Sequence, residues 1–180
     1  IILVDYIEFN LKIAKFARSL GIPVLFYIAP QVWAWREKRA KTFIKCIDHL
    51  AVIFPFEEVY FKKYTNNITY VGHPLSKRSD LMNSIKDYSQ RNIDLGIFPG
   101  SRESEIKNNL HLMVDCIQKN KKENVRIFYA NETSKEIIEN LLPFEFHTYL
   151  VSGKDTYKVS DCKKALCASG TITLELAMLE

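Results

Sequence analysis

Polar and small side chains follow runs of apolar residues at four places in the sequence. The places are Asp5, Gly72-His73-Pro74, Pro99-Gly100-Ser101-Arg102 and Ser169-Gly170-Thr171. Ligands of open parallel sheets bind beyond the carboxyl ends of the strands, so residues that follow strands are the better candidates for chemistry. The first two places offer a carboxylate and an imidazole for proton transfer. The other two offer amides, hydroxyls and a guanidinium for binding an anion.

The segment Pro99-Gly100-Ser101-Arg102, here named the 99–102 turn, joins a predicted strand to a predicted helix. Gly100 lets the backbone approach a ligand closely, and Ser101 can cap the helix or donate to an oxygen. Arg102 can pair with a phosphate through its planar guanidinium. A capped strand-to-helix turn with a solvated arginine is an equally good interpretation of the same four residues.

Ser169-Gly170-Thr171, here named the 169–171 turn, has the same position after another strand. Amides and hydroxyls at a helix N-terminus bind anions, although Ser and Thr are also ordinary N-cap residues. Glu175 follows Thr171 by four residues, about one helical turn, and its carboxylate suits the hydroxyl pair of a ribose. Two such turns, without a GxGxxG or GxxxxGK[ST] pattern, indicate a nucleotide bound without a P-loop.

Asp5 and His73 are the candidates for proton transfer. Asp5 ends an apolar strand and can act as a general base, although a strand-end cap is the more common role of such a residue. His73 can donate to a phosphate or accept a proton, and a loop histidine held by backbone hydrogen bonds is an equal alternative.

A basic, aromatic segment at residues 31–41 can form a surface for an anionic partner. It contains both tryptophans of the chain, and residues 35–45 hold five positive charges against one negative charge. Anionic lipid or a phosphorylated sugar suits this composition, nucleic acid is a competing partner, and a helix with buried tryptophans is the structural alternative. The surface residues we single out are Gln31, Trp33, Trp35, Arg36 and Arg39.

Strand and helix patterns alternate along the chain, which is typical of parallel α/β proteins. We expect strands at residues 1–4, 24–28, 50–54, 68–71, 94–98, 125–130, 144–150 and 165–168. We expect helices at residues 8–20, within 32–47, and at 55–64, 103–120 and 135–142, with a short one near Thr156 and a last one from the 169–171 turn. The periodicity predicts apolar core-facing stripes at Phe9, Ile13, Phe16 and Leu20, and at Ile106, Leu110, Met113 and Ile117.

Composition and charge limit the class of protein. The chain has 180 residues, 47% of them apolar, so a core can form and disorder is excluded as a class. No apolar run approaches the roughly 18 residues of a spanning helix. Four cysteines without a CxxC pair favour a reduced cytoplasmic protein, and no metal or other cofactor is expected. Residues 1–90 carry a net charge of +5 and residues 91–180 a net charge of −1, which indicates two units with different partners.

The domain boundaries follow from these patterns. We expect a first unit at residues 1–75, a polar linker at 76–92 that is rich in Ser, Asp, Asn and Lys, and a second unit at 93–180. The sequence begins with Ile1 inside a predicted strand and stops inside a helical pattern, so we expect an internal piece of a longer protein.

Several segments together resemble the lipid-A-disaccharide synthases, which are inverting glycosyltransferases of the two-domain GT-B architecture. They are VDYIEFN (4–10), APQVWAWR (29–36), FPFE (54–57), VGHP (71–74), PGSRESEI (99–106) and ASGT (168–171) with Leu174-Glu175. The family usually has Pro and Asp at the positions of Ile7 and Glu8, and Ser at that of Ala29. The resemblance implies two Rossmann-like parallel-sheet units, both truncated here: part of an acceptor-side domain, then the first part of a nucleotide-sugar domain.

By resemblance, the reaction joins UDP-2,3-diacylglucosamine to 2,3-diacylglucosamine 1-phosphate through a β-1,6 link and releases UDP. The expected roles are a base for Asp5, a second catalytic position for His73, diphosphate binding by the two turns with Arg102, and ribose binding by Glu175. The expected location is cytoplasmic, with peripheral contact to an anionic inner membrane of a Gram-negative bacterium. The alternatives are another GT-B UDP-sugar enzyme, such as an epimerase or a lipid-linked N-acetylglucosaminyltransferase, and a basic nucleic-acid-binding module.

Overall fold

The computed structural model describes residues 1–32, 37–119 and 124–179. They form two compact units, Ile1–Lys77 and Arg78–Glu180. Each unit contains a four-stranded, wholly parallel sheet with helices between the strands, which confirms the α/β fold class.

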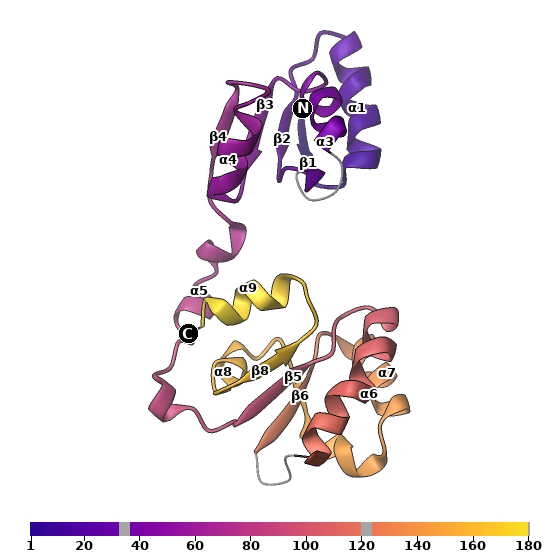
Figure 1. The fold of residues 1–180 in the computed structure, drawn as a ribbon, viewed down its shortest axis with the longest axis vertical. Helices are drawn as coiled ribbons and strands as arrows, with labels where there is room; N and C mark the ends of the chain where they lie inside the picture. The colour runs from indigo at the N-terminus through magenta and orange to yellow at the C-terminus, as the bar shows by residue number, and fades with distance from the viewer. Residues whose placement is uncertain (33–36, 120–123, 180) are drawn as a thin grey trace. The chain divides into compact units, whose positions relative to one another are not determined.

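The first unit has the strand order β1-β2-β3-β4 (Figure 1). Its elements are β1 (Ile2–Val4), α1 (Ile7–Ser19), β2 (Leu25–Tyr27), α3 (Glu37–Ile44), β3 (His49–Val52), α4 (Pro55–Phe61), β4 (Ile68–Tyr70) and the 3₁₀ turn η1 (Pro74–Lys77). Leu3, Phe26 and Leu50 are paired in register and buried, and the rings of Phe26 and Phe43 meet edge to face with centroids 4.9 Å apart. Apolar burial on this one face of the sheet holds the helices in place.

Helix α1 packs through a different stripe from the expected one. Its buried residues are Asn10, Ala14 and Ala17, while Phe9, Phe16 and Leu20 are 58%, 67% and 59% exposed. The prediction that these larger residues face the core is therefore wrong for three of its four positions, and Ile13 packs partly against the core. Small residues at spacings of four and three let the helix lie close to the sheet, so close approach decides the buried face rather than residue size.

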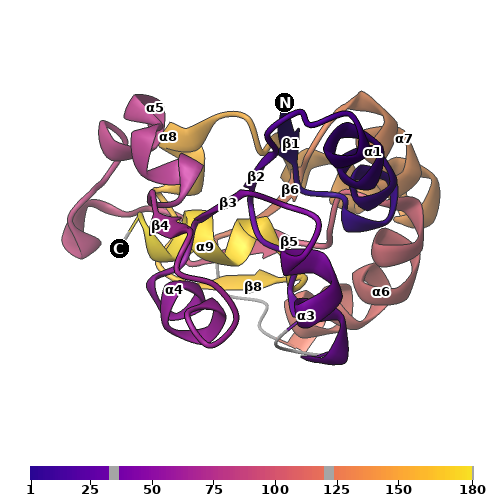
Figure 2. The same cartoon turned by 90° about the horizontal axis from the view of Figure 1, so that it is seen from above.

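The second unit has the strand order β7-β6-β5-β8. It contains α5 (Ser79–Met82), η2 (Tyr88–Gln90), β5 (Leu95–Phe98), α6 (Glu103–Lys119), β6 (Val125–Tyr129), α7 (Glu132–Leu141), η3 (Phe144–Tyr149), β7 (Leu150–Ser152), α8 (Thr156–Val159), β8 (Ala165–Cys167) and α9 (Thr171–Ala177). Helices α6 and α7 lie side by side on one side of the sheet, and α8 and α9 lie on the other (Figures 1 and 2). The chain thus adds strands in one direction from β5 and then returns to place β8 on the opposite side of β5.

The core of the second unit confirms the stripe predicted for α6. Its members Ile106, Leu110, Met113 and Ile117 are all buried against the sheet.

Residues 144–150, expected as a strand, instead form the 3₁₀ helix η3, and β7 follows it. Phe146 is buried there while Phe144 is 86% exposed, and the backbone amide of Phe146 donates to the carbonyl of Pro143. Proline restricts the backbone where this turn begins. The aromatic residues of the segment are typical of strands, which is why the sequence predicted one.

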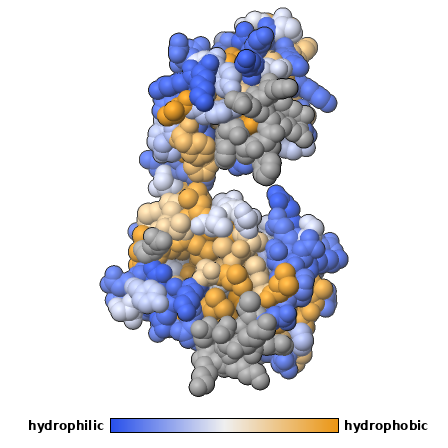
Figure 3. Space-filling model, viewed as in Figure 1, coloured by the Kyte–Doolittle hydropathy of each residue, from blue (hydrophilic) through white to orange (hydrophobic). Residues whose placement is uncertain are grey.

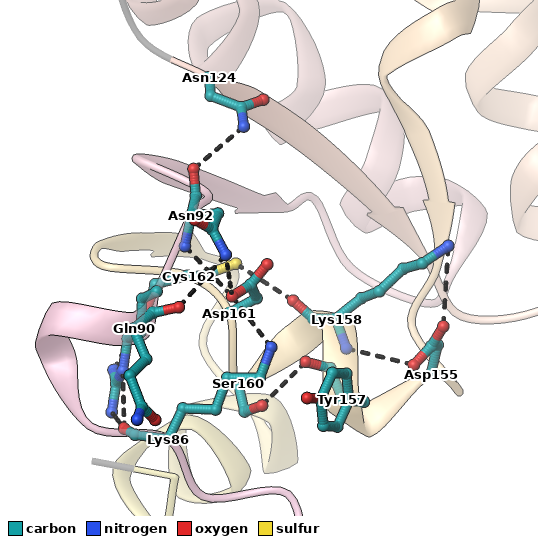
Figure 4. Close-up of polar contacts among 11 residues, drawn as sticks. Lys86, Gln90, Asn92, Asn124, Asp155, Tyr157, Lys158, Ser160, Asp161 and Cys162 are labelled. Atoms are coloured by element: carbon teal, nitrogen blue, oxygen red, sulfur yellow. Dashed lines mark hydrogen bonds and ion pairs between the residues drawn. The ribbon is translucent and has the colours of Figure 1, made fainter.

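Residues 78–92 are bound to the second unit, so the segment expected as a linker differs from the structure. Leu81 and Ser84 are buried, and Ser84 Oγ lies 2.9 Å from Thr156 Oγ1. Lys86 and Asn92 both bond to Asp161, with Lys86 Nζ 3.0 Å from its carboxylate (Figure 4). The polar composition that indicated a linker reflects this network of hydrogen bonds.

Candidate functional site

A cavity of about 460 Å³ opens at the carboxyl ends of the strands in the second unit. Each of the four strands of this sheet is followed by residues that line the cavity: 100–102 after β5, Ala130 after β6, Gly153 and Lys154 after β7, and 168–172 after β8. Stacked Phe98 and Phe128, whose ring centroids are 4.6 Å apart, are also among its lining residues. This is the position at which parallel sheets bind ligands.

The two predicted anion-binding turns lie next to each other in this cavity. Strands β5 and β8 are neighbours, Phe98 pairs with Cys167, and the amide of Ala168 donates to the carbonyl of Phe98 at 2.8 Å. Strands β6 and β7 are added on one side of β5 and β8 on the other, so the 99–102 and 169–171 turns meet at a topological switch point. The structure thus brings together Gly100, Ser101, Arg102, Ser169, Gly170, Thr171 and Glu175.

Glu105 is a cavity residue that we did not predict. Its Oε2 accepts the amides of Ser101 at 3.2 Å and Arg102 at 3.4 Å, and its Oε1 lies 2.8 Å from Arg102 Nη1. The bond from the Ser101 amide, followed by the contacts of Arg102, lowers the pKa of Glu105 despite partial desolvation. A capping box has Glu three residues after its Ser or Thr, whereas Glu105 follows Ser101 by four, so this pattern did not indicate the bond.

Gly100 makes this arrangement possible. Its φ is +119°, and a Cβ placed on it would lie 2.8 Å from both Cβ and Oε2 of Glu105. Only glycine adopts this backbone angle at low cost and leaves room for the carboxylate. Arg102 has a side chain that is 80% exposed, so its guanidinium is held by Glu105 alone among the described ion pairs and is accessible to a ligand.

Arg78 is the second cavity residue that the sequence did not indicate. Its Nε and Nη2 donate to the two carboxylate oxygens of Asp80, with Nε at 3.1 Å, and its Nη1 lies 3.2 Å from Glu175 Oε1. The hydrogen bond to Asp80 raises the pKa of Arg78 and lowers that of Asp80. Arg78 and Glu175 are 97 residues apart, and Arg78 belongs to the polar segment for which the sequence predicts a linker, so no local pattern predicts the pair.

The cavity has a positive excess of charge. Its lining includes the cations Arg78, Arg102 and Lys154 and the carboxylates Glu105 and Glu175. Lys154 is exposed, and its amide is anchored to Ser152 Oγ at 3.3 Å. Two arginines paired to carboxylates and an exposed lysine suit a ligand with a doubly charged phosphate group.

Asp5 lies at the carboxyl end of β1 in the first unit. Its backbone and that of Tyr6 have positive φ angles of 51° and 31°, and its amide donates to the carbonyl of Tyr27 at 2.9 Å. The side chain of Asp5 is exposed. Residues with a Cβ seldom adopt such angles, and strained turns of this kind concentrate at functional sites.

His73 follows β4, on the other edge of the same sheet. Its Nδ1 accepts the amide of Leu75 at 3.2 Å, so the neutral ring carries its proton on Nε2. Its ring lies against Phe54, with centroids 5.4 Å apart. Because β1 and β4 are separated by three strand spacings, about 14 Å, the sheet does not bring Asp5 and His73 into contact.

The basic, aromatic surface is only partly covered by the structure. Gln31 is exposed and follows Pro30, whose carbonyl accepts the amide of Val32 at 2.7 Å. Trp33, Trp35 and Arg36 lie outside the described residues, and so does the side chain of Arg39, whose backbone belongs to α3.

Two further properties concern membranes and metals. Within the described ranges, no helix is both long and apolar enough to cross a membrane. In the same ranges, His, Cys, Asp and Glu side chains form no group of three or more that could hold a metal ion.

On the face shown in Figure 3, apolar side chains gather on the second unit around α9, a helix without fully buried residues.

Comparison with known proteins gives one consistent result. Residues 1–180 match the family described as lipid-A-disaccharide synthetase. The chain is 35% identical to the lipid-A-disaccharide synthases of Nitrosococcus oceani and of Coxiella burnetii strain RSA 331, and 34% identical to that of Geobacter sulfurreducens. Each match covers 99% of this chain and 49% or 50% of the relative, so the chain spans about half the length of these curated relatives.

Proposed function

The chain belongs to the lipid-A-disaccharide synthetase family, and we propose that it takes part in the glycosyl transfer after which that family is named. In this reaction the 6-hydroxyl of 2,3-diacylglucosamine 1-phosphate attacks the anomeric carbon of UDP-2,3-diacylglucosamine. A β-1,6 C–O bond forms, the anomeric C–O bond to the diphosphate breaks, and UDP leaves. The product belongs to lipid A biosynthesis.

One observation supports this proposal above the others. The 99–102 and 169–171 turns meet at the switch point of the second sheet, in a cavity whose lining has one more cation than carboxylates. Phosphates of nucleotides bind at such positions because backbone amides and positive side chains converge there. We therefore assign the second unit, whose residues 93–180 include both turns, to the nucleotide sugar.

Arg102 and the two turns are proposed to bind the diphosphate, and Glu175 the ribose. Arg102 is exposed enough to exchange its bond to Glu105 for one to a phosphate oxygen. The charge that develops on the departing UDP is then met by a guanidinium and by amides that are already in place, which lowers the barrier. Glu175, fixed by Arg78, presents its second carboxylate oxygen to the hydroxyl pair of a ribose.

Asp5 is proposed as the base that takes the proton of the acceptor 6-hydroxyl. Its exposed carboxylate stands at the carboxyl edge of the first sheet, where an acceptor in the 1–75 domain would bind. His73 is the second candidate. Its Nε2 proton suits donation to a phosphate of the acceptor better than proton abstraction, because Nδ1 is already occupied by Leu75.

The substrates imply a location and a partner. Both carry acyl chains, so we propose a cytoplasmic enzyme in peripheral contact with the anionic inner membrane of a Gram-negative bacterium. The basic, aromatic residues Gln31, Trp33, Trp35, Arg36 and Arg39 are the proposed contact. Family membership disfavours the epimerase, the lipid-linked N-acetylglucosaminyltransferase and the nucleic-acid-binding module.

Turnover by the full-length protein tests the proposal. The protein is incubated with UDP-2,3-diacylglucosamine and 2,3-diacylglucosamine 1-phosphate, and products are identified by mass spectrometry. We expect a disaccharide 1-phosphate and one equivalent of UDP. Release of UDP without disaccharide, or formation of a sugar epimer, would indicate one of the other UDP-sugar reactions.

A further inference from the structure

The turn between β1 and α1 holds two consecutive residues in the left-handed region. Asp5 has φ 51°, and Tyr6, the N-cap of α1, has φ 31° and ψ 68°. Aspartate tolerates this region better than most residues, whereas tyrosine does not. A two-residue stretch of this kind persists only when surrounding contacts hold it in place.

Asn10 provides those contacts. Its side-chain Nδ2 donates to the carbonyl of Val4 at 2.9 Å and to that of Asp5 at 2.8 Å, so one amide group bonds both carbonyls of the turn. The backbone amide of Asn10 also donates to the carbonyl of Tyr6 at 3.2 Å. Asn10 is only 8% exposed, and it is one of few buried polar residues in the described part of the chain.

Packing against the sheet does not explain the choice of this residue. Asn10 shares its buried stripe on α1 with Ala14 and Ala17, and an alanine would fit the same surface. Burying an amide is unfavourable unless its hydrogen bonds are satisfied, and here both donors are used on the turn. An aspartate at this place would oppose two carbonyl oxygens with a carboxylate.

We propose that Asn10 is a positioning residue for Asp5. By holding the carbonyls of Val4 and Asp5, it fixes the left-handed turn and therefore the direction in which the Asp5 carboxylate leaves the sheet. Loss of these bonds lets the turn relax, and the carboxylate then samples orientations that do not reach the acceptor. This inference rests on the proposed role of Asp5 as the base.

The test uses Asn10→Ala in the full-length protein. We expect kcat to fall about 10- to 100-fold, the range for a misplaced catalytic group, while the KM for both sugars and the Kd for UDP change less than twofold. Adding Tyr6→Gly should restore most of the turnover, because glycine adopts the left-handed conformation without help. Asn66→Ala, which truncates an exposed asparagine in the same unit, is the matched control and should be silent.

Hydrogen exchange gives a readout that does not depend on activity. The Asp5 amide is bonded to the carbonyl of Tyr27, so its protection reports the turn. We expect faster exchange of this amide in Asn10→Ala and recovery in the double variant. Wild-type protection and turnover in Asn10→Ala overturns the inference, and so does a double variant that regains protection without turnover.

Two other outcomes are also decisive. If Asn10→Ala does not fold, the double variant is measured, and its failure to fold shows that Asn10 serves the core and overturns the inference. Asp5→Asn is measured in parallel. Should Asp5→Asn keep its turnover while exchange still shows that Asn10 holds the turn, the proposed base is wrong and the structural part of the inference stands.

Discussion

Replacing Gly100 by alanine should disrupt the 99–102 turn through two effects that the structure separates. At φ +119° an alanine is strained, at a cost of about 1–3 kcal/mol. Its Cβ would also lie 2.8 Å from Cβ and Oε2 of Glu105, and displacing that carboxylate removes its bonds to the Ser101 and Arg102 amides. We therefore expect the second unit to be destabilised by more than the roughly 1–3 kcal/mol of backbone strain alone, and the UDP affinity to be at least tenfold lower.

Urea unfolding followed by hydrogen exchange of α6 peptides measures the first quantity, and calorimetric titration with UDP measures the second. Gly21→Ala is the control for backbone strain alone, because Gly21 has φ +72° and nothing within 4 Å of a Cβ. It should cost about 1–2 kcal/mol in the first unit and leave the UDP affinity unchanged. Glu105→Ala should lower the stability of the second unit less in the Gly100→Ala background than in the wild type, because the two substitutions act on one contact. Wild-type stability and UDP affinity in Gly100→Ala would refute the description of this turn.

Three further changes test other parts of the molecule. Asp5→Asn should lower turnover by roughly 100-fold or more and leave UDP binding unchanged, as measured by initial rates and calorimetry; near-normal turnover would exclude the base. Arg78→Ala should weaken UDP binding about 3- to 10-fold, because Glu175 loses its partner. The control Arg18→Ala breaks an exposed ion pair with Asp48 in the first unit and should leave UDP binding unchanged. Equal effects of the two substitutions on UDP binding would remove Arg78 from the site. Asp161→Asn should destabilise the second unit by about 1–3 kcal/mol in urea unfolding at neutral pH, because Lys86 loses its partner. Burial alone would raise the pKa of Asp161, but the bonds from Lys86 and Asn92 hold this pKa below its ordinary value. The stabilisation by Asp161 is therefore complete above the pKa of the unfolded chain and is lost as the pH falls through the pKa of the folded protein. An Asp161→Asn variant that is equally destabilised at pH 7 and pH 2 would contradict this.

The sequence predicted best those features that depend on local period. The stripe of α6 from Ile106 to Ile117 is buried as expected, because the rest of this helix is mostly polar and offers no comparable second stripe to the sheet. The same method gave the wrong face for α1, since Phe16 is exposed and Ala14 and Ala17 are buried. Period alone cannot tell which of two stripes lies against a sheet when the closer approach belongs to small residues.

The candidate site was predictable to a similar extent. The 99–102 and 169–171 turns could be expected to lie together, because residues after parallel strands share one edge of the sheet. Arg78 could not be found, because its partner Glu175 is 97 residues away and only the folded sheet brings them together. Glu105 and Asn10 were within segments that we had singled out, yet their bonds to neighbouring backbone depend on turn geometry that spacing does not specify.

Binding of UDP in the cavity of the second unit is measured most directly by calorimetric titration of the full-length protein, beside Arg102→Ala. We expect a single UDP site in the wild type and an affinity about 10- to 100-fold lower in the variant, the loss of one charged hydrogen bond. Polynucleotide titrated at two salt concentrations serves as the control for nonspecific anion binding, and UDP should show the weaker dependence on salt. A wild-type protein that binds no UDP, or a variant that binds it as tightly as the wild type, would contradict the assignment of this cavity to the nucleotide sugar.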